Sequence, residues 1–233
     1  MTTPPDRLLV SEIFESVQGE GVSLGVPSVF LRLAHCNLRC GWCDTKYTWD
    51  WHTYDIRKEV HECSLDQTVD TLQRLRPRNL VVTGGEPLLQ QTALVSLLRR
   101  LGRDWTSEVE TAGTLVPDAQ LTAIITRWNV SPKLENSGNP TDKRLRPEAL
   151  RAFAALPNAS FKFVLAATSD LAEVSDLIAR FELPSERVML MPEATEAGRL
   201  NELAQDLVET CIQHGYRLSY RLHVALWGDK RGV

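Results

Sequence analysis

Three cysteines lie close together in the segment AHCNLRCGWCDT, where Cys36, Cys40 and Cys43 have the spacing C-x3-C-x2-C. A four-iron cubane normally takes four thiolates, one for each iron. The next cysteine along the chain is Cys63, so this loop supplies only three. Metal sites that perform chemistry keep one position open for a substrate or cofactor. The spacing therefore predicts an iron–sulfur cluster with one open iron.

A structural zinc site is the alternative for the same residues, with His35, Asp44 or His52 as the fourth ligand. Zinc sites usually pair their cysteines as C-x2-C, which makes the observed order uncommon among them. A disulfide framework is disfavoured because the chain has an odd number of cysteines. We interpret Cys63 and Cys211 as structural residues.

Length and composition favour one globular domain over residues 1–233, because 43% of the residues are hydrophobic and 24% are charged. The net charge of −4 argues against a general nucleic-acid or anionic-membrane surface, which needs concentrated Lys and Arg. The start of the chain, MTTPPDRLLVSE, lacks a basic segment followed by a long apolar one. We therefore expect a cytoplasmic protein.

Short apolar runs alternate with helical patterns along the chain, as in βα units. The expected strands cover residues 28–34, 79–83, 107–111, 128–131, 160–166, 187–191 and 216–222. Between them, apolar residues recur at helical spacing, for example after a capping box formed by Ser64 and Gln67 and before a stop at Gly102. This order predicts an α/β fold, an open or partial (β/α) barrel with a mostly parallel sheet.

Polar segments follow four of these strands, at residues 83–86, 110–111, 131–133 and 192–193. The carboxyl ends of parallel strands meet at one rim of a barrel, where active sites of such folds lie. We therefore expect these segments to form one site together with the cysteine loop.

The cysteine triad resembles the signature of the radical S-adenosylmethionine (SAM) enzymes, and TGGEP at residues 83–87 resembles their glycine-rich segment. For two glycines alone, an ordinary turn would be the simpler interpretation. The resemblance implies that SAM binds the open iron of a [4Fe-4S] cluster and is cleaved by one electron to a 5′-deoxyadenosyl radical. It assigns these SAM contacts: Gly85, Glu86, Glu110, Ser131, Pro132 and Lys133.

The N-terminal stretch EIFESVQGEGVSLGVPSVFLRLAHCNLRCGWCDT resembles the family of 7-carboxy-7-deazaguanine synthases, lyases of queuosine precursor biosynthesis. That family converts 6-carboxy-5,6,7,8-tetrahydropterin to 7-carboxy-7-deazaguanine, with ring contraction and loss of ammonia. The resemblance resumes at TGGEP, ET and SPK and in the RLHVALWG tail. It assigns the substrate contacts to Val17, Gln18, Gly19, Glu20, Arg32 and Thr83.

The same resemblance places a Mg²⁺ ion on the Thr45 hydroxyl, with Asp44 as a supporting or turn-capping group. A turn without metal is the alternative for these two residues. A surface ion pair is the alternative for Glu20 and Arg32, although an Arg inside an apolar run would be costly to leave unpaired. His223 and Trp227 in the tail, and Lys162 in a strand, are not assigned to the site.

By family analogy we expect a homodimer that receives electrons from a flavodoxin or ferredoxin. Residues 44–63, which contain Trp49 and Trp51, are too irregular to assign and are interpreted as a lid or dimer contact, and residues 216–233 as a closing segment. Two positions depart from the family pattern: His35 stands where Gly is common, and ETAG replaces ETN or ETS. The rival interpretations are a glycyl-radical-enzyme activating enzyme and a non-catalytic zinc or iron–sulfur module.

Overall fold

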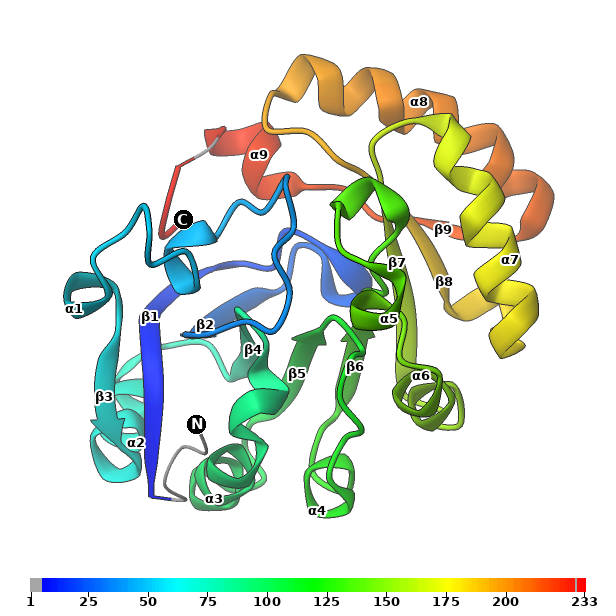
Figure 1. The fold of residues 1–233 in the computed structure, drawn as a ribbon. Coiled ribbons are helices and arrows are strands. Elements are labelled where there is room, and N and C mark those ends of the chain that lie inside the picture. The colour runs from blue at the N-terminus through cyan, green and yellow to red at the C-terminus, as the bar shows by residue number, and fades with distance from the viewer. Residues whose placement is uncertain (1–5, 229) are drawn as a thin grey trace.

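A computed structural model describes residues 6–228 and 230–233. Two parts of the chain lie outside the described residues. They are residues 1–5, at the start of the chain, where no targeting signal was expected, and Asp229, in the expected closing segment. The described part contains a nine-stranded sheet in the order β3-β1-β2-β4-β5-β6-β7-β8-β9. Figure 1 shows this sheet as a curved layer with the longer helices on its outer side.

The parallel part of the sheet runs from β2 to β9, and each neighbouring pair within it is parallel. Its strands are β2 (Pro27–Leu33), β4 (Asn79–Gly84), β5 (Thr106–Thr111), β6 (Arg127–Val130), β7 (Ala159–Leu165), β8 (Val188–Pro192) and β9 (Arg217–Leu218). Strands β2 to β8 agree closely with the predicted ranges. Their apolar character fits a sheet that is covered by helices.

The predicted strand at residues 216–222 is wrong over most of its length. Only Arg217–Leu218 are extended in β9, and the chain then turns into α9 (Leu222–Trp227). The strand ends early because two polar side chains bind other segments. The Ser219 hydroxyl accepts from the backbone N–H of Gly21 at 2.9 Å, and the buried Arg221 donates to the Ala194 carbonyl at 2.8 Å. These contacts draw the chain out of the sheet.

An antiparallel edge was not predicted. Strand β1 (Arg7–Val17) pairs antiparallel with both β2 and β3 (His61–Ser64). The charged residues in RLLVSEIFESV hide the apolar alternation of β1, because Glu12 stands directly opposite Arg32 and is paired with it. Among the described strands β3 does not pair with β9, so the expected open, mostly parallel barrel is confirmed.

Helices cover the outer side of the sheet (Figure 1). They are α2 (Leu65–Arg74), α3 (Gln91–Leu101), α4 (Ala119–Thr122), α6 (Pro147–Ala154), α7 (Leu171–Phe181) and α8 (Ala197–His214). The single turns α1 (Ile56–Glu59) and α5 (Thr141–Arg144) belong to connecting segments. The predicted capping box of Ser64 and Gln67 is present, and Gly102 ends α3. In residues 6–228 and 230–233, no helix has both the length and the apolar character needed for a bilayer crossing.

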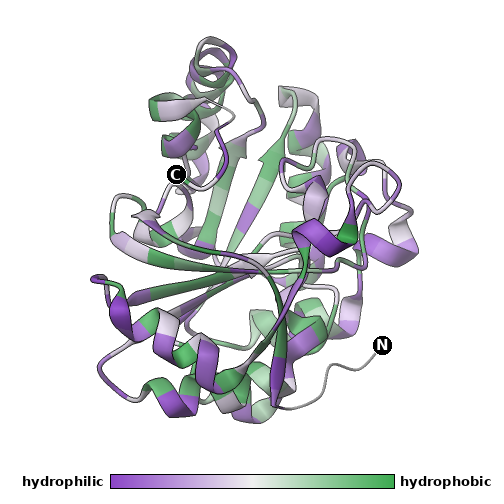
Figure 2. Ribbon diagram, turned by 90° about the vertical axis from the view of Figure 1, so that its left-hand side faces the viewer, coloured by the Kyte–Doolittle hydropathy of each residue, from purple (hydrophilic) through white to green (hydrophobic). Residues whose placement is uncertain are grey.

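The core lies between the sheet and these helices, where Figure 2 shows hydrophobic strands beneath helices with hydrophilic outer faces. Trp128, Phe153, Phe161 and Phe163 are fully buried, and the rings of Trp128 and Phe153 meet edge to face at 5.2 Å. Burying each such side chain contributes about 2–3 kcal/mol. The packed core therefore fixes the strand ends that carry the polar segments.

Candidate active site

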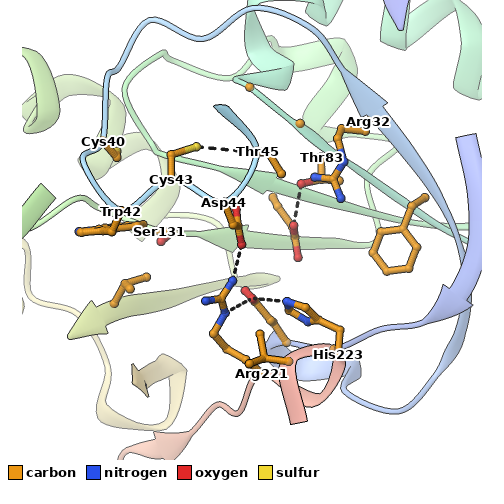
Figure 3. A pocket seen from close by; sticks show the side chains of 18 of the residues that line it. Arg32, Cys40, Trp42, Cys43, Asp44, Thr45, Thr83, Ser131, Arg221 and His223 are labelled. Atoms are coloured by element: carbon orange, nitrogen blue, oxygen red, sulfur yellow. Dashed lines mark hydrogen bonds and ion pairs between the residues drawn. The ribbon is translucent and has the colours of Figure 1, made fainter. Parts of the chain in front are cut away.

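The carboxyl ends of the parallel strands and the cysteine loop surround a cavity of about 440 Å³ (Figure 3). A cavity of this size is typical of small-molecule sites. The predicted residues that line it are Val17, Gln18, Gly19, Glu20, Arg32, Cys36, Cys40, Cys43, Thr45, Thr83, Gly85, Glu110, Ser131 and Lys133. The expectation that these segments, far apart in sequence, form one site is met by the geometry.

Each of the three cysteine sulfurs accepts a hydrogen bond from a different N–H group. The donors are the Leu38 backbone to Cys36 at 3.4 Å, Asn139 Nδ2 to Cys40 at 3.3 Å, and Trp49 Nε1 to Cys43 at 3.3 Å. Burial raises the pKa of Cys36 to about 12 and also raises the pKa of Cys40. Binding of a metal cluster would therefore have to displace protons from these thiols.

The three sulfurs line the cavity without gathering around one point. In the described part of the chain, no group of three or more Cys, His, Asp or Glu side chains is placed to hold a single metal ion. Zinc needs its ligands around one ion, whereas a cubane takes each thiolate on a different iron. The residues present fit a cubane, which Cys36, Cys40 and Cys43 would hold at the wall of the cavity.

Two glycines at the end of β4 allow the glycine-rich segment to lie directly against the end of β2 and the start of the cysteine loop. A Cβ on Gly84, whose φ is +129°, would approach the Leu33 carbonyl oxygen to 2.1 Å, and one on Gly85 would approach the His35 carbonyl oxygen to 1.9 Å. These glycines are therefore required by the contact between two protein segments. Gly85 also lines the cavity, so it remains a candidate SAM contact.

The departure at His35 has a backbone explanation. His35 has a φ of +70°, a conformation that glycine adopts at little cost and other residues adopt rarely. Its N–H donates to the Thr48 carbonyl at 2.7 Å, and its carbonyl accepts from Glu86 N–H at 2.8 Å. The side chain packs edge to face on Trp51 at 5.5 Å. These contacts hold the turn in place without glycine.

Two predicted SAM contacts lie apart from the cavity. Glu86 is completely buried and accepts from Thr111 Oγ1 at 2.8 Å and from the Ala112 backbone at 2.9 Å. Burial raises the pKa of Glu86, since no cation pairs with it. Pro132 lies on the other side of the sheet, in a small apolar gap beside Phe161. Both residues lie beyond the ends of their strands, and neither is among the residues that line the cavity.

An amide and two carboxylates connect the predicted substrate residues. Gln18 Nε2 donates to Glu108 at 3.2 Å and to Glu110 at 3.1 Å, and Thr83 Oγ1 donates to Glu110 at 2.7 Å. Burial raises the pKa of Glu108, which also accepts from the Ser23 hydroxyl. Gln18 is thus committed to protein partners, while Glu110 and Thr83 face the cavity as a pair.

A charge network forms the far wall of the cavity, opposite the cysteines, and the sequence did not predict it; Lys162 and Arg221 are buried, Glu20 is half-buried, and Asp44 at the end of the network is exposed. Glu20 pairs with Lys162 and, at 3.2 Å, with Arg221 Nε, while Arg221 also pairs with Asp44 (Figure 3). His223 lies 3.9 Å from Glu20. Burial alone would raise the pKa of Glu20, but the positive charges of Lys162, Arg221 and His223 outweigh it and lower that pKa. The network joins residues 20, 44, 162 and 221.

Arg32 does not form the ion pair with Glu20 that was considered as an alternative from the sequence. Its Nε pairs with Glu12 at 3.0 Å, directly across the β1–β2 ladder, and not with Glu20. Tyr47 donates its hydroxyl to the same Glu12 oxygen at 3.0 Å. The guanidinium of Arg32 lines the cavity, so this ion pair presents a fixed cation to a ligand.

Thr45 and the segment after β6 complete the near wall. The Thr45 hydroxyl contacts Cys43 Sγ at 3.6 Å and faces the cavity. Lys133 Nζ donates to the Ser131 hydroxyl at 3.0 Å and lies 5.3 Å from the centre of the Trp42 ring. A hydroxyl, an ammonium and an aromatic face therefore lie together beside the cysteine loop.

The end of the chain also reaches the cavity, which Gly228 and residues 230–233 line. Arg231 pairs with Glu12 and, at 2.8 Å, with Glu59, and its guanidinium lies 3.7 Å from the Tyr47 ring centre. The apolar–basic tail gave no local signal for this position. Only the folded chain brings it to β1.

The described part of residues 44–63 forms η2 (Lys46–Thr48), α1 and the start of β3. Trp49, Tyr47 and Tyr54 from this segment line the cavity. The segment therefore contributes directly to the site. The other 3-10 turns connect strands and helices elsewhere; they are η1 (Gly21–Ser23), η3 (Pro87–Gln90), η4 (Glu135–Ser137), η5 (Thr168–Asp170) and η6 (Ser185–Arg187).

Comparisons with known proteins agree with this site. A sequence family described as a 4Fe-4S single cluster domain matches residues 17–130. A curated protein named 7-carboxy-7-deazaguanine synthase from Pyrobaculum aerophilum is 37% identical over 97% of both chains, and one of that name from Halobacterium salinarum is 34% identical over 95% of this chain and 91% of its own.

The crystal structure of QueE from Escherichia coli superposes with a TM-score of 0.72 at 27% identity, covering 93% of this chain and 95% of that one. Streptococcus suis SuiB bound to S-adenosylmethionine shares the fold, with a TM-score of 0.52 at 13% identity over 79% of this chain and 44% of its own. Taken with the three-cysteine loop and the cavity beside it, these matches show that the chain belongs to the 7-carboxy-7-deazaguanine synthase family.

Proposed function

We propose that this protein is a radical SAM lyase that converts 6-carboxy-5,6,7,8-tetrahydropterin to 7-carboxy-7-deazaguanine, with loss of ammonia. The observation that carries the proposal is the position of the three cysteines. They line one wall of a cavity of about 440 Å³. The opposite wall carries the Glu20 carboxylate and the cations of Lys162 and Arg221 that pair with it. A pterin carries amide and amine edges and a carboxylate, which match such a mixed polar wall.

Cys36, Cys40 and Cys43 would hold a [4Fe-4S] cluster, and SAM would lie between it and the ends of β4, β5 and β6. The cluster and SAM together supply one-electron chemistry that ends in abstraction of a hydrogen atom. Gly85 offers backbone groups to SAM, while Ser131 and Lys133 offer a hydroxyl and an ammonium for its carboxylate. Glu110 accepts hydrogen bonds at the same rim.

The substrate would lie against the far wall. Arg32, already oriented by Glu12, offers the planar guanidinium that a carboxylate binds best. Glu20 is ionised because Lys162 and Arg221 surround it, so it accepts hydrogen bonds from amine or amide N–H groups. Residues 17–19 and Thr83 border the same space. Residues 230–233 of the tail border this space as well.

We also propose a Mg²⁺ ion on the Thr45 hydroxyl. Magnesium keeps several waters and shares its shell with substrate oxygens, so a single protein ligand is sufficient. Among the residues that the structure describes, the Thr45 hydroxyl has one long contact, to Cys43 Sγ at 3.6 Å, and it borders the cavity from which a cation would bind. Asp44 is already paired with Arg221, which favours a supporting role for it.

The protein acts on a small molecule, and we propose the further partners by family analogy: a homodimer in the cytoplasm, reduced by a flavodoxin or ferredoxin. Analytical ultracentrifugation would test the dimer, and the rate of SAM cleavage with each reduced carrier would test the donor. A monomer at all concentrations would contradict the first of these.

The activity is tested with protein purified without oxygen and reconstituted with iron and sulfide. Incubation with SAM, a strong reductant and the carboxytetrahydropterin should yield 7-carboxy-7-deazaguanine. An intact cluster that produces no 5′-deoxyadenosine would contradict radical chemistry, and 5′-deoxyadenosine without the deazaguanine would contradict the substrate. Thr45→Ala should retain the cluster and lose Mg²⁺ stimulation, whereas Thr195→Ala, on another cavity-lining threonine, should keep it.

A further inference from the structure

Two N–H donors to the cysteine sulfurs come from side chains outside the cysteine loop. Trp49 Nε1 donates to Cys43 Sγ at 3.3 Å, and Asn139 Nδ2 donates to Cys40 Sγ at 3.3 Å. Cys36 receives its hydrogen bond from the Leu38 backbone, which no side-chain substitution removes. Within the described residues, Trp49 and Asn139 are therefore the two side-chain N–H donors to the sulfurs, and the Thr45 hydroxyl adds only a longer contact to Cys43, at 3.6 Å.

Both donors are fixed in orientation by further contacts. Asn139 is 9% exposed, and its Oδ1 accepts from the Arg39 backbone at 2.8 Å. This orients Nδ2 toward Cys40 Sγ and toward the Ser137 hydroxyl, to which it also donates at 3.2 Å. Beside it, the Gly41 backbone donates to the Ser137 carbonyl at 3.0 Å. The segment after β6 thus holds the cysteine loop through both ends of one amide.

Trp49 is held in a similar way from the opposite side. The Arg39 guanidinium lies 4.7 Å from the centre of its ring, and the Trp49 backbone donates to the Lys46 carbonyl at 3.0 Å. Arg39 is itself tied to the cysteine loop, since Nη1 donates to the Cys36 carbonyl at 2.6 Å. The indole N–H is therefore directed at Cys43 by packing that does not depend on the sulfur.

We propose that Trp49 and Asn139 are positioning residues that set the reduction potential of the cluster through these N–H···S hydrogen bonds. The inference rests on the cluster of the proposed function. A one-electron reduction adds negative charge that is shared by the sulfurs, and an N–H dipole stabilises the more negative state. Each donor therefore raises the midpoint potential, and its removal makes reduction harder. Such outer contacts are a known means of tuning metal sites.

The decisive variant is Trp49→Phe, which keeps an aromatic ring beside Arg39 and removes only the N–H. We expect full iron content, a midpoint potential shifted to more negative values in an EPR-monitored redox titration without substrate, and loss of the hyperfine coupling between the reduced cluster and a ¹⁵N-labelled indole. Asn139→Ala should shift the potential in the same direction and also release iron faster, because it frees the Arg39 backbone. The double variant should shift it further than either.

Matched controls lie in the same two segments. Trp51→Phe changes a tryptophan that packs on His35, and Asn136→Ala removes an amide that accepts from Trp42 Nε1 at 3.2 Å; both should keep the wild-type potential. A wild-type potential in Trp49→Phe and Asn139→Ala with iron retained would overturn the inference. Loss of iron from Trp49→Phe would overturn it too, because the side chain would then hold the loop and not tune the sulfur. Absence of any cluster in the wild-type protein would instead contradict the proposed function.

Discussion

The two walls of the cavity are built from different interactions. On the cysteine side, the three sulfurs accept from uncharged donors: a backbone N–H group, the Asn139 amide and the Trp49 indole. On the far side, the contacts are ion pairs that join Glu20 to Lys162 and Arg221. Both walls are largely buried, so the difference is one of charge and not of exposure to water.

Two buried glutamates express this difference. Glu86 lies behind the cysteine loop with only neutral donors, and burial raises its pKa. Glu20 is opposed by burial as well, yet the surrounding cations lower its pKa. A buried carboxylate can thus be held by neutral hydrogen bonds at the cost of its charge, or by cations that keep it ionised. The cysteine side uses the first solution and the substrate side uses the second.

Removal of a cluster ligand should have the largest effect on the cysteine side. Cys40→Ala leaves two thiolates for a cubane, so we expect loss of the iron–sulfur absorbance and of all turnover. Iron content, visible absorbance and product formation measure this directly. Cys63→Ala, outside the loop, should keep all three. Full iron content and activity in Cys40→Ala would contradict the ligand assignment.

Exchange of each glutamate for glutamine should lower the free energy of unfolding by different amounts on the two walls. Glu20→Gln leaves Lys162 and Arg221 without their shared counter-ion, and we expect a loss of about 3–5 kcal/mol in the free energy of unfolding. Glu86→Gln keeps one acceptor oxygen and loses one hydrogen bond, which should cost about 1–3 kcal/mol. Urea unfolding followed by tryptophan fluorescence measures both values. Equal losses would show that charge is not what distinguishes the walls.

The pH dependence of stability should have opposite signs for these glutamates. The lowered pKa of Glu20 stabilises the folded state above the ordinary pKa of 4.5, and this contribution is lost as the pH falls below that value. The raised pKa of Glu86 disfavours the folded state at neutral pH, and this cost is relieved as the pH falls. The stability gap between wild type and Glu20→Gln should therefore stay nearly constant above the ordinary pKa of 4.5 and narrow as the pH falls below it, while wild type should gain relative to Glu86→Gln. Parallel curves would refute the assignment.

The smallest effect on stability is expected at the tail. Arg231 is partly exposed, and pairs of that kind contribute about 0–1 kcal/mol. Arg231→Ala should therefore change the free energy of unfolding little, but raise KM for the pterin because residues 230–233 line the cavity. Arg199→Ala, which loses an exposed pair with Glu202, is the matched control and should leave KM unchanged. An unchanged KM in Arg231→Ala would remove the tail from the substrate wall.

Much of the parallel sheet could be predicted from the sequence because its strands are short apolar runs between helices with clear stripes. Strand β1 could not, because its ion pair between Glu12 and Arg32 breaks the apolar alternation that marks a strand. The residues at 216–222 have strand-like composition, but the buried side chains of Ser219 and Arg221 find partners that end the strand. The local sequence pattern does not predict secondary structure correctly where a polar side chain forms its hydrogen bond or ion pair with a segment that is distant in sequence.

The sequence alone determined the three thiolates, the polar strand ends and the family, because each depends on residue type and short spacing. Only the tertiary structure decided which charges pair across the cavity, that Glu86 and Pro132 face away from it, and that Trp49 and Asn139 reach the sulfurs. The charge pairs join residues up to 219 positions apart, as between Glu12 and Arg231. Pairing of buried groups is set by proximity in the folded chain, which residue order does not encode locally.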